Sequence, residues 1–296
     1  MTFELQGRVA LVTGAGAGLG RAHAHCLARS GARIVVNDLG AGANRVAEEI
    51  NAAGGEAIAF QASVTDEDGI NAMVRETLER WGRVDILVNN AGNLRDKSFG
   101  KMTLDDFRSV LDVHLMGGVI CSKAVWEPMR RQKYGRIVFT TSSSGLYGNF
   151  GQANYSAAKM GLVGLMQTLA IEGAKSNILV NCLAPTAATA MTDKLLVAQA
   201  KRVLQPEAVS PALLPLVSQH APTRAIVCAG AGHFARAYVT LTRGYFLGND
   251  AQTLERIFAS WEVIGDREHE QIPDSASAQT YQELISAFRP QSETNL

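Results

Sequence analysis

The sequence has no excess of charge of either sign. Its 28 Lys and Arg residues are matched by 28 Asp and Glu residues, so the formal net charge is +0 over 296 residues. Such a balanced chain lacks the basic surface that attracts nucleic acid or an anionic membrane. We therefore expect neither nucleic acid nor a membrane as a partner.

Cysteines are few, and long apolar runs are missing. The four cysteines are widely spaced with no CxxC pair: Cys26, Cys121, Cys182 and Cys228. This spacing favours reduced, buried thiols and gives no disulfide framework or metal site. No basic segment precedes an apolar stretch at the start, no uncharged run is long enough to span a membrane, and the final SETNL is no peroxisomal tripeptide. We expect a cytoplasmic protein.

Short β-branched runs alternate with helical patterns over the first 185 residues. This alternation predicts βαβ units and an α/β fold with a Rossmann-like, doubly wound parallel sheet. Strands are expected at 8–14, 32–38, 56–61, 84–92, 135–143, 178–185 and 225–230. Helices are expected at 19–30 and 66–81, from residue 103 onward, and through residues 155 and 159.

No linker or change of composition interrupts the first 185 residues, which predicts one domain. The pattern then loosens, and residues 206–222 hold four of the eight prolines. We expect an NAD-binding catalytic domain over 1–230. Residues 231–296 should form a C-terminal extension, packed on the same domain or at an oligomer interface.

The first strand ends in a glycine-rich turn, TGAGAGLG. Gly14, Gly18 and Gly20, with Leu19 between the last two, fall at the turn and at the start of the next helix. Glycine lets backbone N–H groups approach a pyrophosphate at the positive end of a helix. A strand before the glycines and a helix after them predict a dinucleotide site.

Asp38 ends the second strand, 18 residues after Gly20. A carboxylate there can accept hydrogen bonds from both ribose hydroxyls and repels a 2′-phosphate. Ala17 and Asn37 offer no positive charge to bind that phosphate. The alternative is that Asp38 only caps a turn before Gly40. The glycine turn favours the cofactor interpretation, with NAD preferred over NADP.

Tyr155 precedes Lys159 by four residues, so both side chains lie on one face of a helix. The pair is either a tyrosine stacked on a lysine stem or a phenol whose pKa the ammonium lowers. A base that works near neutral pH needs a shift of roughly two to three pKa units. At an effective dielectric of 20 a nearby ammonium supplies about 3–4 kcal/mol, so the lysine suffices only in a site largely closed to water.

The chain resembles the short-chain dehydrogenase/reductase family. The matching segments occur in family order: TGAGAGLG, NNAG at 89–92, Ser142, YSAAK at 155–159 and VNCLAP at 180–185. The resemblance implies a Rossmann-like fold and NAD(P)-dependent interconversion of alcohols and ketones. Several segments, among them NLRDKSF and GLYGNFGQANYSAAK, resemble more closely the (3R)-hydroxyacyl-CoA dehydrogenase part of peroxisomal multifunctional enzymes of type 2 and related 17β-hydroxysteroid dehydrogenases.

The resemblance implies a role for each catalytic residue. Tyr155 is the general base, Ser142 holds the substrate oxygen, and Lys159 also binds the nicotinamide ribose. Hydroxyls flank Ser142 on both sides, so the family spacing of thirteen residues to Tyr155 selects it. His114 stands where many members carry Asn, so it either joins a proton relay behind the lysine or is a packed histidine.

The resemblance also implies further cofactor contacts: Ser63, Val64, Asn90, Ala91, Gly92 and Pro185. Ser63 replaces the acidic residue of many relatives, and Thr186 follows Pro185 in place of glycine. The favoured function is a stand-alone, NAD-dependent (3R)-hydroxyacyl-CoA dehydrogenase. A hydroxysteroid dehydrogenase and a non-catalytic NAD-binding regulator are the alternatives, and the presence of both Tyr155 and Lys159 argues against the latter.

Three further features bear on substrate and partners. Leu146, Tyr147 and Phe150 predict an apolar wall for an acyl or steroid body. Small residues on the helix face that carries Gly161 and Gly164 predict close packing of another helix, hence a homodimer or homotetramer. The basic run RRQKYGR at 130–136 precedes a strand, where ligands do not bind, and is interpreted as a solvated face rather than a CoA site.

Overall fold

The computed structural model describes residues 5–189 and 197–288. Two compact units are present, Met1–Ala237 and Tyr238–Leu296. We call the first the catalytic unit and the second the C-terminal unit.

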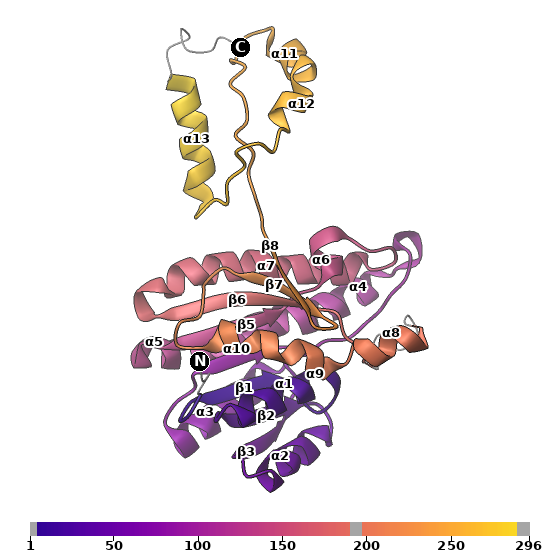
Figure 1. Cartoon of the computed structure of the whole chain (residues 1–296), viewed down its shortest axis with the longest axis vertical. Coiled ribbons are helices and arrows are strands. Elements are labelled where there is room, and N and C mark those ends of the chain that lie inside the picture. The colour runs from indigo at the N-terminus through magenta and orange to yellow at the C-terminus, as the bar shows by residue number, and fades with distance from the viewer. Residues whose placement is uncertain (1–4, 190–196, 289–296) are drawn as a thin grey trace. The chain divides into compact units, whose positions relative to one another are not determined.

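The catalytic unit is built on one sheet of eight strands in the order β3-β2-β1-β4-β5-β6-β7-β8 (Figure 1). Neighbouring strands are parallel except β8, which runs antiparallel to β7. The predicted doubly wound, Rossmann-like α/β fold is therefore confirmed. The strands are β1 (Val9–Thr13), β2 (Arg33–Asp38), β3 (Ala57–Gln61), β4 (Ile86–Asn89), β5 (Gly135–Thr140), β6 (Ile178–Pro185), β7 (Ile226–Gly230) and β8 (His233–Ala237).

Helices cover both faces of this sheet, so the central strands are apolar on both sides. Ala10 and Val12 of β1 face one core and Leu11 faces the other. The first core is closed by α1 (Gly18–Arg29), α2 (Gly42–Ala52), α9 (Pro206–Val209), η4 (Ser210–Ala212) and α10 (Leu213–Val217). The second is closed by α3 (Glu67–Trp81), α5 (Gly117–Gln132) and α7 (Ala153–Gly173).

Shorter elements complete the catalytic unit. They are η1 (Phe99–Lys101), α4 (Leu104–Leu111), the π-helical turn η2 (Asp112–Met116), α6 (Ser143–Tyr147), η3 (Ala174–Ser176) and α8 (Ala198–Val203). The long helix expected from residue 103 is thus interrupted by a π turn. Helix α2 and strand β8 are not predicted from the sequence, and β8 extends the sheet beyond residue 230.

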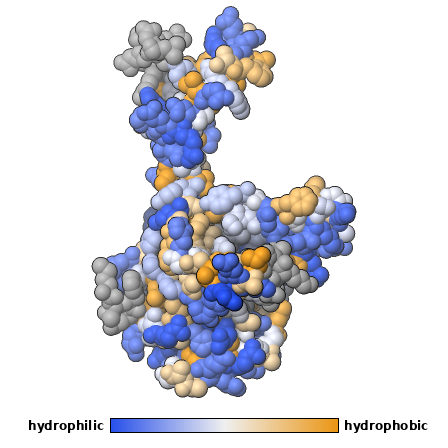
Figure 2. Space-filling model, turned by 45° about the vertical axis from the view of Figure 1, so that its right-hand side comes forward, coloured by the Kyte–Doolittle hydropathy of each residue, from blue (hydrophilic) through white to orange (hydrophobic). Residues whose placement is uncertain are grey.

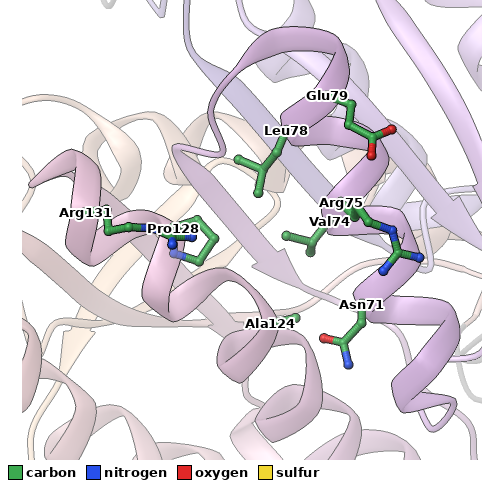
Figure 3. Close-up of a pocket in the computed structure, with 8 residues that line it drawn as sticks. All are labelled: Asn71, Val74, Arg75, Leu78, Glu79, Ala124, Pro128 and Arg131. Atoms are coloured by element: carbon green, nitrogen blue, oxygen red, sulfur yellow. The ribbon is translucent and has the colours of Figure 1, made fainter.

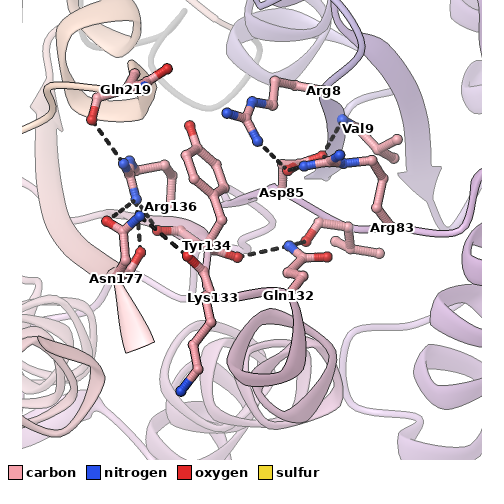
Figure 4. A network of polar contacts seen from close by, with 12 residues as sticks. Arg8, Val9, Arg83, Asp85, Gln132, Lys133, Tyr134, Arg136, Asn177 and Gln219 are labelled. Carbon is pink, nitrogen blue, oxygen red and sulfur yellow. Dashed lines mark hydrogen bonds and ion pairs between the residues drawn. The ribbon is translucent and has the colours of Figure 1, made fainter. Parts of the chain in front are cut away.

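The basic run at 130–136 is a mixture of surface and core, so its interpretation as a solvated face is wrong for its three buried residues, Tyr134, Gly135 and Arg136. Tyr134 and Arg136 are buried, and the Tyr134 ring lies 3.7 Å from the Arg8 guanidinium and 4.1 Å from that of Arg136 (Figure 4). Arg136 donates to the carbonyl oxygens of Ser218 and Gln219 at 2.9 and 3.0 Å. Loop carbonyls at the edge of the sheet need donors, and a buried guanidinium supplies several.

Asp85 closes the same network from the start of β4 (Figure 4). Its fully buried carboxylate accepts hydrogen bonds from Arg8, from Arg83 and from the backbone N–H of Val9. The first strand is therefore fastened to the fourth at the amino-terminal edge of the sheet, opposite to the edge where ligands bind.

An open groove of about 460 Å³ lies between α3 and α5 (Figure 3). It contains none of the residues that the sequence predicts for the site. Its lining combines an apolar floor with charged edges: Asn71, Val74, Arg75, Leu78, Glu79, Ala124, Pro128 and Arg131.

The C-terminal unit has no core of its own within its described residues, 238–288. None of these residues is buried, and large apolar side chains are exposed in its helices α11 (Thr253–Ala259), α12 (Trp261–Ile264) and α13 (Ala276–Phe288). Examples are Phe258, Trp261 and Tyr281, which are 76%, 66% and 68% exposed. In Figure 2 apolar residues reach the surface beside hydrophilic ones. Among the described residues, no helix has the length and apolar character that a membrane span requires.

Candidate active site

The glycine-rich turn joins β1 to α1 at the carboxyl-terminal edge of the sheet. Gly14 has φ +62°, and a Cβ on it would lie 2.8 Å from the Cα of Ala91. A Cβ on Gly20 would lie 2.2 Å from the carbonyl oxygen of Gly14. A side chain at either position would collide with the turn itself or with the residues that follow β4, so this close packing requires glycine. The pyrophosphate site at the start of α1 stays a prediction.

Thr13 and Asn90 hold this turn in place. The Thr13 hydroxyl accepts hydrogen bonds from the N–H groups of Asn90 and Ala91 at 3.0 and 3.1 Å. The Asn90 side chain donates to the carbonyls of Thr13 and Gly14 at 3.0 and 3.2 Å. Thr13 was not predicted as a site residue from the sequence. The available signal was a hydroxyl side chain at the end of a predicted strand.

Asp38 lies against the glycine turn. Its carboxylate accepts hydrogen bonds from the N–H of Gly16 at 2.9 Å and from that of Gly40 at 3.2 Å. The turn-capping role that the sequence left open is therefore present. The Asp38 carboxylate can accept further hydrogen bonds, because each of its oxygens has two lone pairs and accepts only one of these two bonds.

The other predicted cofactor contacts lie along the same edge. The Ser63 hydroxyl pairs with that of Thr65 at 2.8 Å, and Val64 is buried. Pro185 is the last residue of β6, and the next N–H, that of Thr186, donates to Ala229 at 2.8 Å. Ser63 and Val64 follow β3 and Pro185 ends β6, so all three lie at the carboxyl-terminal edge of the parallel strands, where ligands of open sheets bind.

The three predicted catalytic side chains converge where β5 ends. Ser142 caps α6, its hydroxyl accepting from the N–H of Ser144 at 3.1 Å, and the same hydroxyl lies close enough to Tyr155 to lower the pKa of the phenol. Tyr155 lies in the first turn of α7, and the Lys159 ammonium nitrogen is 5.4 Å from the centre of its ring. The contact with Tyr155 distinguishes Ser142 from Thr141, whose hydroxyl donates to the Lys159 carbonyl at 2.7 Å.

Lys159 is almost completely enclosed. Only 3% of the residue is exposed, and its Nζ donates to the carbonyl oxygen of Thr140 at 2.5 Å. Burial lowers the pKa of Lys159 to about 7, because the charged form loses its hydration. A closed site of this kind is what the sequence argument required for the lysine to act on a phenol.

The expectation that Lys159 lowers the pKa of Tyr155 is wrong for this arrangement. Burial raises the pKa of Tyr155, the hydrogen bond with Ser142 lowers it, and the Asp96 carboxylate raises it further. Lys159 is not among the causes of this shift, because with its own pKa lowered to about 7 the lysine loses its charge before the phenol titrates. Additional positive charge is needed before the phenol can lose its proton near neutral pH.

His114 lies in the π turn and touches the tyrosine. The two rings meet edge to face with their centres 5.1 Å apart. Its Nε2 lies 2.8 Å from the carbonyl oxygen of Asn93, and burial lowers the pKa of His114 to about 3, so the ring is neutral.

A small cavity of about 10 Å³ lies between His114 and Lys159. His114 Nδ1 and Asn89 Oδ1 are buried without a hydrogen-bond partner, and both residues line this cavity. A space of this size with two unsatisfied polar atoms suits one water molecule. Asn89 was not predicted as a site residue, because only its surroundings in the folded protein distinguish it and no sequence pattern does.

Residues 8–200 match the family model of the short chain dehydrogenases. The chain belongs to the short chain dehydrogenase family. It is accordingly an oxidoreductase acting on CH–OH groups. Among the described residues, 5–189 and 197–288, no cluster of His, Cys, Asp or Glu side chains could hold a metal ion.

Similar proteins extend this assignment. The chain is 45% identical over 277 residues to the peroxisomal hydratase-dehydrogenase-epimerase of Saccharomyces cerevisiae, covering 89% of this chain and 31% of that protein. The structure of full-length peroxisomal multifunctional enzyme type 2 from Drosophila melanogaster aligns with a TM-score of 0.81 and 36% identity, covering 96% of this chain and 50% of that chain. The predicted likeness to the type 2 enzymes is thus confirmed.

A further solved structure resembles this short chain dehydrogenase. A 7α-hydroxysteroid dehydrogenase complexed with NADH and 7-oxo glycochenodeoxycholic acid aligns with a TM-score of 0.73 and 30% identity, over 78% of this chain and 96% of that chain. The multifunctional relatives are longer, and the chain spans about a third of the yeast protein and half of the fly protein. Family and neighbour together support a nicotinamide cofactor.

Proposed function

We propose that the protein oxidises a secondary alcohol to a ketone with NAD, and that its substrate is a (3R)-hydroxyacyl-CoA. The observation that carries the chemistry is the contact of Tyr155 with Ser142 beside the enclosed Lys159. The likeness to enzymes named hydratase-dehydrogenase-epimerase and multifunctional enzyme type 2 supports the choice of substrate.

Cofactor binding falls to the residues around the glycine turn. Gly14, Gly18, Leu19 and Gly20 would receive the pyrophosphate, and Asp38 would bind the adenosine ribose and disfavour a 2′-phosphate. The remaining contacts would come from Ser63, Val64, Asn90, Ala91, Gly92, Pro185, Tyr155 and Lys159. The bound nicotinamide supplies a hydride acceptor and, when oxidised, a positive charge.

The protein's own groups handle the proton and the oxygen. Ser142 donates a hydrogen bond to the substrate oxygen and holds it near Tyr155, whose phenolate takes the hydroxyl proton. Lys159, one turn further along α7, would add its positive charge to that of the oxidised nicotinamide and so favour the phenolate. These are the roles that the geometry of the three side chains supports.

His114 would connect the lysine to a buried water. Its Nδ1 and the Asn89 Oδ1 both need a partner, and the cavity between them and Lys159 has room for one water. A proton taken up at Tyr155 could then leave through Lys159 and this water. A neutral imidazole suits the role, because it can accept a hydrogen bond at Nδ1.

The decisive experiment measures NADH formation at 340 nm with purified protein and a panel of alcohols. The panel contains (3R)- and (3S)-hydroxyacyl-CoA, a 17β-hydroxysteroid and a short polar alcohol. The highest kcat/KM is expected for the (3R) thioester. A strong (3S) preference, or best activity on the polar alcohol, contradicts the substrate assignment but not the dehydrogenase assignment.

Two alternatives are tested by the same panel. A hydroxysteroid dehydrogenase is supported by the exposed apolar side chains of Tyr147 and Phe150, 71% and 89% exposed, and by the steroid-binding neighbour. It predicts highest activity with the steroid. A non-catalytic NAD-binding regulator predicts NADH binding without turnover of any alcohol.

We further infer a homodimer or homotetramer. One exposed face of α7 carries small and apolar residues, among them Ala157, Met160, Gly164 and Thr168. Gly161, also predicted for that face, instead packs against Leu115 of the same chain. The uncovered apolar side chains of the C-terminal unit likewise call for a partner surface. The cytoplasmic location stays a prediction, since the named relatives are peroxisomal.

A further inference from the structure

Asn154 is a completely buried polar side chain in the first turn of the helix that carries Tyr155. It is 0% exposed, and its amide group is hydrogen-bonded in three directions. Its Nδ2 donates to the carbonyl oxygens of Arg95 and Asp106 at 3.2 and 3.3 Å, and its Oδ1 accepts from the Tyr155 N–H at 2.8 Å. One side chain thus joins α7 to α4 and to the loop between β4 and η1.

The bond to the Tyr155 N–H takes the place of an ordinary helix cap. The first N–H groups of a helix have no partner within it, so a side chain at the N-terminus commonly accepts from one of them. Gln152, the N-cap of α7, directs its amide elsewhere: it donates to Asp96 at 2.7 Å and accepts from Asn149 at 2.9 Å. The Oδ1 of Asn154 therefore holds the turn that carries the tyrosine.

The loop after β4 and helix α4 are also bonded to each other and to the start of α7. The Lys97 N–H donates to the Gly151 carbonyl oxygen at 2.9 Å, and the Lys97 ammonium pairs with the Asp106 carboxylate at 2.7 Å. These two bonds reach the same segments that Asn154 contacts through Arg95 and Asp106. Asn154 is completely buried where the three segments meet.

We propose that Asn154 is a positioning residue for alcohol oxidation that acts through Tyr155. By joining the Tyr155 N–H to the backbone of Arg95 and Asp106, it fixes the first turn of α7 relative to the loop and to α4. Ser142 follows a different element, β5, so the distance from its hydroxyl to the phenol depends on where this turn lies. The inference rests on the proposed role of Tyr155 as the base.

The test replaces Asn154 with a side chain of similar shape and no polar atoms. Asn154→Leu removes all three bonds, so the first turn of α7 loses its ties to the loop and to α4. Because a displacement of about 1 Å can slow a reaction on the order of 10²-fold, kcat for the best alcohol of the panel should fall by roughly 10- to 100-fold. KM for that alcohol and the NADH dissociation constant should stay within roughly threefold, because the glycine turn and Ser142 are unchanged.

Asn181→Leu is the matched control. Asn181 is also 0% exposed. Its Nδ2 donates to the carbonyl oxygens of Leu216 and Pro222 at 3.4 and 2.8 Å, and its Oδ1 accepts from the Ala225 N–H at 2.9 Å. The substitution removes the same kinds of bond, but these bonds hold β6 to residues 216–225. It should therefore lower the free energy of unfolding like Asn154→Leu, while kcat stays within roughly threefold.

Urea unfolding verifies that each variant is folded, and the stoichiometry of NADH binding gives the fraction of competent molecules. If Asn154→Leu does not fold, Asn154→Ser replaces it in the test. The serine hydroxyl is too short to join all three partners and leaves room for water beside them, so kcat should fall by roughly tenfold.

Two results overturn the proposal. One is a kcat within roughly threefold of the wild type when the bonds of Asn154 are removed. The other is an equal loss of kcat in Asn181→Leu, which would make the loss a general consequence of lowered stability. A wild-type protein that oxidises no alcohol in the panel is a different outcome, because it rejects the proposed function itself.

Discussion

Lys159 directs its ammonium at the carbonyl oxygen of Thr140, 2.5 Å away, while the same nitrogen lies 5.4 Å from the centre of the Tyr155 ring. The lysine is therefore anchored to the backbone, and any effect of its charge on the phenol acts through space. Its influence depends on the exclusion of water from the gap between the two side chains.

Tyr155→Phe should reduce turnover by a factor of roughly 10²–10⁴, because it removes the proton acceptor. The ring remains in contact with His114, so NADH affinity should change by less than about twofold. Initial rates at 340 nm and fluorescence titration with NADH measure the two quantities. A loss of turnover below tenfold would show that Tyr155 is not the base.

Lys159→Met should inactivate the protein and yet stabilise it at low pH. The folded-state pKa, about 7, lies below the ordinary value of 10.5. Between these pH values the unfolded chain binds more protons than the folded protein, so the free energy of unfolding rises as the pH increases from 7 to 10.5. Below pH 7 the buried charge of Lys159 destabilises the folded protein fully. Methionine removes this destabilisation, with a gain on the order of 5 kcal/mol at pH 6 and less than about 1 kcal/mol at pH 10.

Urea unfolding of wild type and Lys159→Met at the two pH values measures this difference. Lys123→Met is a suitable control, because Lys123 is exposed on α5. A gain of equal size at pH 6 and pH 10 would mean that the charge of Lys159 is not the cause.

Asp38→Asn should shift the cofactor preference toward NADP. The amide oxygen can still accept from the Gly16 N–H, so the turn is kept while the charge that repels a 2′-phosphate is lost. The ratio of NADPH to NADH dissociation constants should fall by roughly tenfold or more. A wild-type protein that already binds NADPH more tightly would refute the argument from Asp38.

Gly92→Ala should destabilise the protein by about 1–3 kcal/mol, because overpacking a buried contact forces side chains to move. A Cβ at this position would lie 2.2 Å from Cε1 of His114. In an His114→Ala background the same substitution should cost much less. Denaturant unfolding of the four proteins gives the coupling, and additive effects would exclude a direct clash.

A chain ending at Ala237 should form a smaller assembly than the full chain, because the exposed apolar side chains of residues 238–288 need a covering surface. Light scattering at micromolar concentration measures both masses. A full chain that is monomeric would contradict the inferred oligomer.

The strands along the chain and the convergence of Ser142, Tyr155 and Lys159 could be predicted because each depends on local pattern or on spacing within the chain. The helix cap at Thr103 and Asp106 was predictable for the same reason, and the structure contains it. The raised pKa of Tyr155 could not be predicted, because its first cause is the burial of the phenol, which depends on tertiary packing. Arg136 was misassigned because its partners are backbone carbonyls far away in the sequence.

The π turn at Asp112–Met116 holds one residue more than an α-helical turn would. Each residue rotates a helix by about 100°, so the turn sets the faces of α4 and α5 out of phase. Deleting a single residue there would restore α-helical phasing and swing the ring of His114 away from Tyr155, although no catalytic residue would have been changed. The geometry of this active site thus depends on the number of residues in the π turn as well as on their types. The π turn should therefore tolerate a substitution better than a change in length.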